Sequence, residues 1–284
     1  MEVGEALRRA QRSLAPVSDS AASDARLLLA DTLGETTTWV LSHNRHVLPT
    51  QTAKAFDDRV GRCAAGEPLP YVLGWWEFYR RKFAVDQSVL IPRPETEILV
   101  ERAIGELRRC DQGARVVDVG TGSGCVAVSL AAEVDDCCVI ATDLSHRALV
   151  VARGNAQRNG VAGRVRLIRA DLLEGLAGGW DVVCANLPYL SAARLRVLPV
   201  ARREPRIALD GGEQGTAITV RLILSLGKVL APGGLGLLEI DEGQAAELGA
   251  LARAEIGGAA VEIVPDIAGR ERLLVIRRRA DDEA

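Results

Sequence analysis

"VVDVGTGSGCVAVSLA", residues 116–131, predicts an apolar strand, a glycine-rich turn and a helix in direct succession. Glycines 120, 122 and 124 would let the backbone approach a ligand closely at the start of the helix. The spacing is GxGxG, and the last glycine of the dinucleotide motif GxGxxG is missing, which weakens a nicotinamide dehydrogenase as an interpretation. A plain tight turn between strand and helix is the alternative that this segment alone leaves open.

Three acidic residues accompany the turn. Asp118 precedes it, Asp143 ends the next apolar segment, and Asp171 follows the third, just before Leu172. A carboxylate at the position of Asp143 can accept both hydrogen bonds of a ribose diol. Asp171 with its apolar neighbour suits the edge and face of an adenine. Each acid alone could simply cap a helix, but three in order at strand ends favour a nucleoside pocket at the edge of a parallel sheet.

Apolar segments alternate with helical patterns after residue 114, which is typical of a parallel sheet covered on both faces. Helices are predicted between the strands at 124–133, 145–158, 214–230 and 242–255. The last two strands are too close for a helical crossover and should pair antiparallel. The predicted fold class is α/β, with a doubly wound, mainly parallel seven-stranded sheet and an antiparallel last strand. The predicted strands are 115–119, 137–142, 164–169, 181–185, 235–240, 260–264 and 272–277.

The first 65 residues contain helical patterns and no clear strand. Ser20 and Thr50 are predicted N-caps, Gly34 and Gly66 are predicted helix ends, and a short helix is expected at 36–42. The alternating, aromatic-rich stretch that follows predicts a β-hairpin. We therefore expect three parts: a helical domain at 1–70, a hairpin linker at 71–94 and an α/β domain at 95–284.

Composition excludes several function classes. The net charge of −3 provides no general attraction to nucleic acid or to anionic lipid. No signal peptide and no apolar run of membrane-spanning length are found, so a cytoplasmic protein is expected. The six cysteines show no metal-ligand spacing, and Cys125, Cys138 and Cys184 are predicted to be small core residues. No metal site is expected.

Four motifs together resemble the release factor glutamine methyltransferases, the PrmC/HemK family of class I S-adenosylmethionine-dependent methyltransferases. They are "IPRPETE" (91–97), "DVGTGSG" (118–124), "NLPY" (186–189) and "EPRIALDGGEQG" (204–215). The resemblance covers nearly the whole chain. "IPRPETE" is predicted either to cap a helix or to line the mouth of the site, and "EPRIALDGGEQG" to line the substrate cleft.

The resemblance implies a set of residues for S-adenosylmethionine, the expected cofactor. Asp143 would hold the ribose hydroxyls, and Asp171 with Leu172 would border the adenine, although leucine stacks less well than the aromatic residue usual in the family. The cofactor-binding set is Gly120, Thr121, Gly122, Ser123, Gly124, Asp143, Asp171, Leu172 and Asn186.

The resemblance also implies a catalytic set, Asn186, Leu187, Pro188 and Tyr189, which corresponds to the family's NPPY. The Asn186 side-chain oxygen and the Leu187 carbonyl would each accept one N–H of a substrate glutamine amide, which orients its nitrogen toward the methyl group. Pro188 and Tyr189 would wall the pocket. Leucine in place of proline keeps the carbonyl but loses the fixed φ angle.

The implied partner is a peptide chain release factor, methylated on the glutamine of its GGQ loop by a monomeric enzyme without stable nucleic-acid or membrane binding. The alternative is an N6-adenine methyltransferase acting on DNA or RNA, because a similar motif handles exocyclic amino groups. Against it, residues 1–80 contain nine Lys and Arg against ten Asp and Glu, so a basic track for nucleic acid is missing. A cofactor-binding protein without catalysis is a further alternative, which the NxPY motif disfavours.

Overall fold

The computed structural model describes residues 1–110 and 113–280. The chain forms two compact units, Met1–Trp75 and Trp76–Ala284. Residues 281–284, the end of the predicted catalytic domain, lie outside the described residues. Among the helices described, none combines the length and apolarity needed to cross a membrane.

The first unit is helical, as its sequence predicts. Thr36 caps the short third helix, because its hydroxyl accepts a hydrogen bond from the Trp39 N–H at 3.1 Å. Gly34 ends the second helix with a left-handed φ of 70°, which confirms the predicted stop. The helices are α1 (Val3–Leu14), α2 (Ala21–Leu33), α3 (Thr37–Ser42), α4 (Thr50–Ala64) and α5 (Leu69–Leu73).

Of the two predicted N-caps in this unit, the position of Ser20 is confirmed and that of Thr50 is wrong. Ser20 occupies the N-cap position of α2, but its hydroxyl donates to the Asp24 carboxylate at 3.2 Å instead of accepting from a backbone N–H. Pro49 precedes α4 as its N-cap, and Thr50 is already the first helical residue. Helix α4 also ends two residues before the predicted stop at Gly66.

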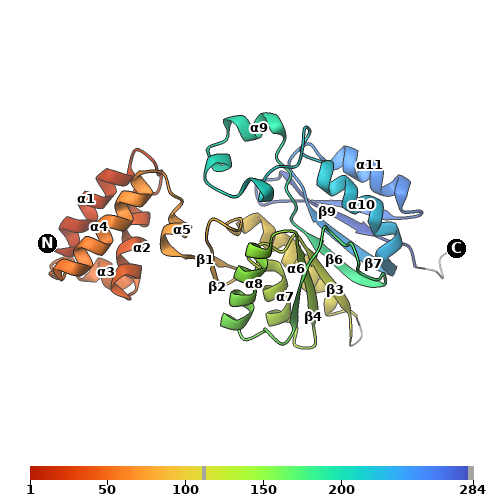
Figure 1. The fold of residues 1–284 in the computed structure, drawn as a ribbon, viewed down its shortest axis with the longest axis horizontal. Helices are drawn as coiled ribbons and strands as arrows, with labels where there is room; N and C mark the ends of the chain where they lie inside the picture. Colours follow the sequence, from red (N-terminus) through yellow and green to blue (C-terminus); the bar gives the residue numbers. More distant parts are fainter. Residues whose placement is uncertain (111–112, 281–284) are drawn as a thin grey trace. The chain divides into compact units, whose positions relative to one another are not determined.

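The second unit contains a seven-stranded sheet in the order β5-β4-β3-β6-β7-β9-β8 (Figure 1). Strand β9 is antiparallel to both of its neighbours and the other pairings are parallel, so the predicted antiparallel last strand is confirmed. The strands are β3 (Arg115–Val119), β4 (Cys138–Asp143), β5 (Val165–Arg169), β6 (Trp180–Ala185), β7 (Leu230–Glu239), β8 (Ala260–Pro265) and β9 (Glu271–Arg277).

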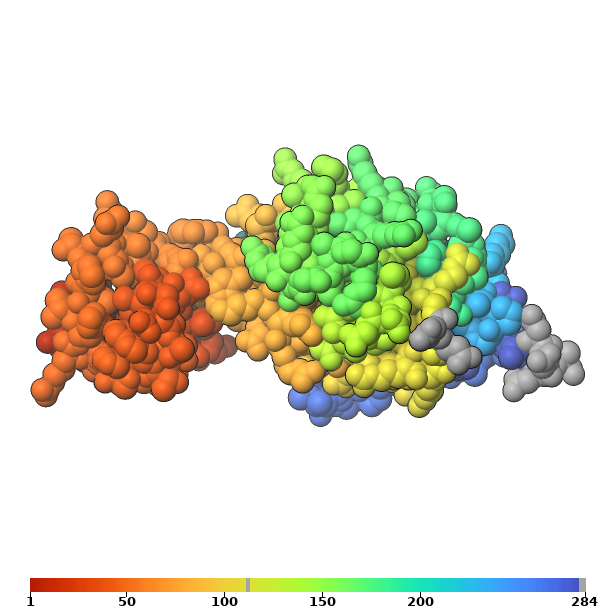
Figure 2. All heavy atoms as spheres, turned by 90° about the horizontal axis from the view of Figure 1, so that it is seen from below, coloured from red at the N-terminus to blue at the C-terminus, as the bar shows by residue number. Residues whose placement is uncertain are grey.

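Helices cover both faces of this sheet (Figure 1). Side chains alternate along β3, so Val116 packs toward one core and Val117 toward the other. One core includes residues of α6 (Glu97–Leu107), α7 (Cys125–Glu133) and α8 (His146–Arg158), and the other includes residues of α10 (Ala217–Val229) and α11 (Ala245–Glu255). In Figure 2 the yellow, green and blue atoms of this unit form one closely packed surface.

A small hairpin precedes the sheet. Strands β1 (Trp75–Phe78) and β2 (Arg81–Ala84) are joined by Tyr79 and Arg80, both with positive φ, as a tight two-residue turn requires. The buried Asn155 of α8 holds this hairpin. Its Oδ1 accepts from the Ala84 N–H at 2.7 Å, and its Nδ2 donates to the carbonyls of Ala84 at 3.0 Å and Ser123 at 2.8 Å. Asn155 thus connects the hairpin to the glycine-rich turn.

The cysteine predictions are partly wrong. Cys184 is fully buried, but Cys138 is exposed at the start of β4, while its neighbour Cys137 is buried. The two adjacent side chains point to opposite sides. The apolar residues around them in the sequence therefore did not predict which of the two cysteines is buried. Within residues 1–110 and 113–280, no cluster of His, Cys, Asp and Glu could hold a metal ion.

We expect Asn155→Ala to lower the free energy of unfolding of the intact chain by about 2–4 kcal/mol, because buried backbone groups lose their partners. Urea denaturation measures the change. Asn159→Ala is the control: this amide, at the C-cap of the same helix, is partly exposed and makes its shorter bond, 3.0 Å, only to the carbonyl of Asn155. Equal losses in the two variants would contradict a special role for Asn155.

Candidate active site

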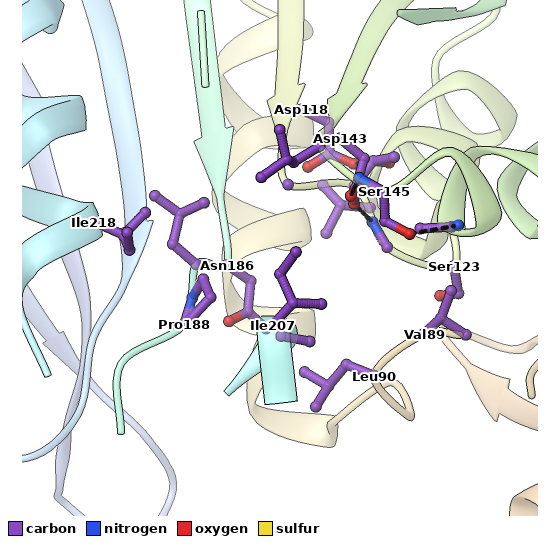
Figure 3. Close-up of a pocket in the computed structure, with 18 of the residues that line it drawn as sticks. Val89, Leu90, Asp118, Ser123, Asp143, Ser145, Asn186, Pro188, Ile207 and Ile218 are labelled. Atoms are coloured by element: carbon purple, nitrogen blue, oxygen red, sulfur yellow. Dashed lines mark hydrogen bonds between the residues drawn. The ribbon is translucent and has the colours of Figure 1, made fainter. Parts of the chain in front are cut away.

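A cavity of about 520 Å³ opens at the carboxyl edge of the parallel strands. Its size suits a small molecule or cofactor, and its position is where ligands bind in sheets of this kind. Figure 3 shows Asp143 and Ser145 toward one end of the cavity, and Asn186 and Pro188 toward the other. The sequence-predicted residues that line it are Gly120, Thr121, Gly122, Ser123, Asp143, Asp171, Leu172, Asn186, Leu187 and Pro188.

The glycine-rich turn is fixed by backbone hydrogen bonds. The Thr121 N–H donates to the carbonyl of Thr142 at 2.8 Å, and the Gly124 N–H donates to the carbonyl of Thr121 at 2.8 Å. Gly120 has a left-handed φ of 71°, and a Cβ there would lie 2.9 Å from Leu187 Cδ2. The positive φ therefore favours glycine, and a Cβ would require the Leu187 side chain to shift. Gly124 does not line the cavity but forms the N-cap of α7.

Asp118 supports this turn from beneath. It is 2% exposed, and its Oδ2 accepts from the Thr121 hydroxyl at 2.6 Å and from the Ala127 N–H at 3.2 Å. Burial raises the pKa of Asp118 to about 6, against the opposing effect of these hydrogen bonds. Its carboxylate thus connects the turn to the first turn of α7.

Asp143 has both carboxylate oxygens in contact with backbone N–H groups. Oδ2 accepts from Gly122 at 2.9 Å and Oδ1 from Ser145 at 2.8 Å. Burial raises the pKa of Asp143, while the two N–H groups lower it. Each oxygen retains a lone pair, so the carboxylate can still accept hydrogen bonds from a ligand in the cavity.

Asp171 and Leu172 lie together on the wall of the cavity. Asp171 forms an ion pair with Arg221 at 2.9 Å, and both side chains are partly exposed. Leu172 has a φ of 52°, which is unusual for leucine, and its carbonyl accepts from the Thr142 hydroxyl at 2.9 Å. This bond to β4 helps to hold Leu172 in a conformation that sterics disfavour.

The four residues of the NLPY segment are divided between two cavities. Asn186, Leu187 and Pro188 line the first cavity, whereas Tyr189 lines a second one of about 580 Å³. The Tyr189 hydroxyl lies 3.4 Å from Glu239 Oε1, a long hydrogen bond. Burial first, and then the nearby charge of Glu239, raise the pKa of Tyr189 well above its ordinary value. Tyr189 is therefore a neutral phenol directed away from the glycine-rich turn.

Leu187 is 4% exposed and packs against the space that Gly120 leaves open. Its side chain belongs to the core cluster that includes Val119 and Ala185, the last residues of β3 and β6. The contact joins the NLPY segment to the glycine-rich turn.

Two further motifs of the sequence meet beside this segment. Arg93 of "IPRPETE" forms an ion pair with Glu204 of "EPRIALDGGEQG", and Glu204 also accepts from the Ile91 N–H at 3.0 Å. A Cβ on Gly211 would lie 2.7 Å from the carbonyl oxygen of Pro188, so glycine permits the close approach of the two loops.

Sequence reasoning missed two residues at the base of the site. Thr96 is 1% exposed and lies between Asn186 and Glu239; it accepts from Asn186 Nδ2 at 2.9 Å and donates to Glu239 Oε2 at 2.7 Å. Thr96 belongs to the "IPRPETE" motif, but the spacing of residues does not predict its contact with Glu239. Glu239 offered one signal, an acid at the end of a strongly apolar strand.

Solved structures share the fold of this chain. A methyltransferase from Pyrococcus furiosus matches with a TM-score of 0.52 and 19% identity, covering 78% of this chain and 99% of that one. The M. jannaschii tRNA m1G37 methyltransferase matches with a TM-score of 0.51 and 16% identity, covering 72% of this chain and 54% of that one.

Sequence comparisons are more specific. The PrmC N-terminal domain family matches residues 5–74, and the methyltransferase small domain family matches residues 95–201. A release factor glutamine methyltransferase from Deinococcus radiodurans is 40% identical over 90% of each chain. One from Moorella thermoacetica is 38% identical over 99% of this chain and 100% of its own. The chain belongs to the release factor glutamine methyltransferase family.

Proposed function

We propose that this enzyme transfers a methyl group from S-adenosylmethionine to the side-chain amide nitrogen of the glutamine in the GGQ motif of peptide chain release factors. One observation carries the proposal: Asn186, with its Nδ2 bonded to Thr96, lines the same cavity as the glycine-rich turn and Asp143. A hydrogen-bond acceptor for an amide substrate thus shares a cavity with residues suited to a nucleoside.

The residues of the cavity fit S-adenosylmethionine. Residues Gly120–Ser123 line the cavity, Asp143 keeps free acceptor capacity, and Leu172 offers an apolar wall beside Asp171. These groups suit, in turn, the methionine end, the ribose diol and the adenine. The proposed cofactor set therefore retains Gly120–Ser123, Asp143, Asp171, Leu172 and Asn186, with Gly124 shaping the turn.

S-Adenosylmethionine would supply an electrophilic sulfonium methyl group. Transfer to the amide nitrogen would break the methyl–sulfur bond, leave a neutral thioether and release one amide proton to water. An amide nitrogen is a weak nucleophile, so the enzyme must position it. Asn186 Oδ1 and the Leu187 carbonyl would each accept one N–H of that amide and would stabilise the positive charge that develops on it. Pro188 would help to exclude water, and Tyr189 would support the segment from its other side.

We also propose that residues 1–70 recognise the release factor, residues 71–94 link the domains and residues 95–284 catalyse transfer. The match to the PrmC N-terminal domain family supports a distinct role for the first part. A substrate that acts in translation termination would place the reaction in the cytoplasm. We propose separately that the enzyme is a monomer.

The direct test incubates the intact enzyme with radiolabelled S-adenosylmethionine and either a release factor or nucleic acid. We expect label on the release factor and loss of that label when the GGQ glutamine is replaced by alanine. Label on DNA or RNA, and none on the glutamine, would favour the adenine methyltransferase instead.

We expect Asn186→Ala to lower kcat for the release factor by about 100- to 1000-fold, because one acceptor for the developing charge is removed. Calorimetry should show nearly unchanged binding of S-adenosylmethionine. Asn159→Ala, which removes an amide outside the cavity, is the control and should keep its activity. Wild-type turnover by Asn186→Ala would rule out the proposed amide contact.

We expect Asp143→Ala to raise the Kd for S-adenosylmethionine by about 10- to 100-fold, because a charged acceptor contributes roughly 1.5–3 kcal/mol per hydrogen bond. Asp181→Ala is a matched control. Asp181 also accepts from a backbone N–H, that of Arg115 at 2.7 Å, but at the amino end of the strands. An unchanged Kd for Asp143→Ala would remove this residue from the ribose site.

A further inference from the structure

The partly buried Asn186 and two buried side chains behind the NLPY segment form a continuous chain of hydrogen bonds. Asn186 Nδ2 donates to Thr96 Oγ1 at 2.9 Å, and Thr96 Oγ1 donates to Glu239 Oε2 at 2.7 Å. Thr96 and Glu239 are 1% and 2% exposed, so water does not compete freely for these bonds.

The fold brings these residues together from three separate segments. Thr96 ends the short helix η1 (Pro94–Thr96), Glu239 ends β7, and Asn186 follows β6. Strands β6 and β7 pair in parallel up to Ala185 and Leu238, so Asn186 and Glu239 come next at the same edge. The segment that contains η1 supplies the hydroxyl between them.

The direction of these hydrogen bonds follows from the carboxylate of Glu239, at which they end. An ionised carboxylate only accepts hydrogen bonds, so the single proton of the Thr96 hydroxyl must be donated to Glu239. The hydroxyl then presents only lone pairs to Asn186, and these match the amide NH₂ but repel the amide oxygen. The NH₂ group therefore faces Thr96, which leaves Oδ1 free for a different partner.

We propose that Thr96 and Glu239 are positioning residues that fix the side-chain amide of Asn186 with its oxygen available to accept an N–H of the substrate. This inference rests on the proposed function and explains why the site would prefer a substrate group that donates an N–H. Neither residue needs to touch the substrate for this effect. If the side-chain amide of Asn186 were rotated by about 180°, its NH₂ group would face the substrate N–H. Two hydrogen-bond donors would then oppose each other.

The protonation state of Glu239 controls this arrangement. Burial raises the pKa of Glu239 to about 7, while the bond from Thr96 lowers it. Protonated Glu239 can donate to Thr96, and the hydroxyl is then free to present its own proton to Asn186. The other charged or titratable groups that act on Glu239 or feel its charge are Arg272 on β9, Glu95 in η1, Tyr189 after β6 and Cys125 on α7.

The first experiment removes the hydroxyl. We expect Thr96→Val, which keeps the shape of the side chain, to lower kcat on the release factor by about 10- to 100-fold. Thr96→Ser should restore most of the activity, and the Kd for S-adenosylmethionine should stay within about twofold of wild type in both variants, since their change lies in amide orientation.

Thr219→Val is the matched control, because Thr219 is a buried threonine of α10 that does not line the cavity. It should retain wild-type kcat. Wild-type kcat in Thr96→Val, or equal losses in Thr96→Ser and Thr96→Val, would overturn the inference. These results differ from failure of the proposed function, in which the wild-type enzyme itself would not label the release factor.

The second experiment uses Glu239→Gln, which keeps size and an acceptor oxygen for Thr96 while removing ionisation. We expect wild-type kcat/KM to fall as pH decreases through about 7, since kcat/KM reports groups of the free enzyme. In Glu239→Gln this acid limb should disappear. An identical acid limb in the two proteins would exclude Glu239 as its origin and overturn the positioning role of the carboxylate.

Discussion

The parallel pairing of β6 with β3 on one side and β7 on the other is the constraint on which the site depends. All three strands end at the same edge, so the glycine-rich turn, the NLPY segment and Glu239 follow neighbouring strands. No local sequence could bring these groups together. The register does so, since Val119 pairs with Ala185 and Ala185 with Leu238, and each functional residue comes directly after a registered pair.

Two buried carboxylates at this edge serve different purposes. Asp118 accepts from Thr121 and Ala127 and so stabilises the turn, whereas Glu239 accepts from a side chain that contacts Asn186. Both have raised pKa values because burial disfavours the charged form. Their ionisation therefore opposes folding as pH rises through about 6 and about 7, respectively. The fold tolerates the cost of ionising these buried groups because a carboxylate only accepts hydrogen bonds and so fixes the orientation of the donors around it.

The sequence predicted the alternation of strands and helices and the place of the glycine-rich turn, because periodicity and glycine spacing are local properties. It also predicted Asp143 at the cavity, because strand ends can be read from apolar segments, whereas Asn186 was placed there by the resemblance of NLPY to the family's motif. Thr96 and Glu239 lie 143 residues apart, and no local pattern encodes their contact. The sequence also did not predict that Pro188 and Tyr189 line different cavities, because this depends on the side of the segment to which each side chain points.

Leu187 shows how packing can replace a covalent constraint. The resemblance to the family leads one to expect proline there, which would fix φ directly and leave less freedom to lose on ordering. Leucine offers no such restriction, but its side chain fills the gap left by Gly120 and joins the core formed by Val119 and Ala185. The backbone is then held by burial of the side chain. Because this contact reaches the glycine-rich turn itself, leucine ties the proposed substrate segment to the proposed cofactor segment.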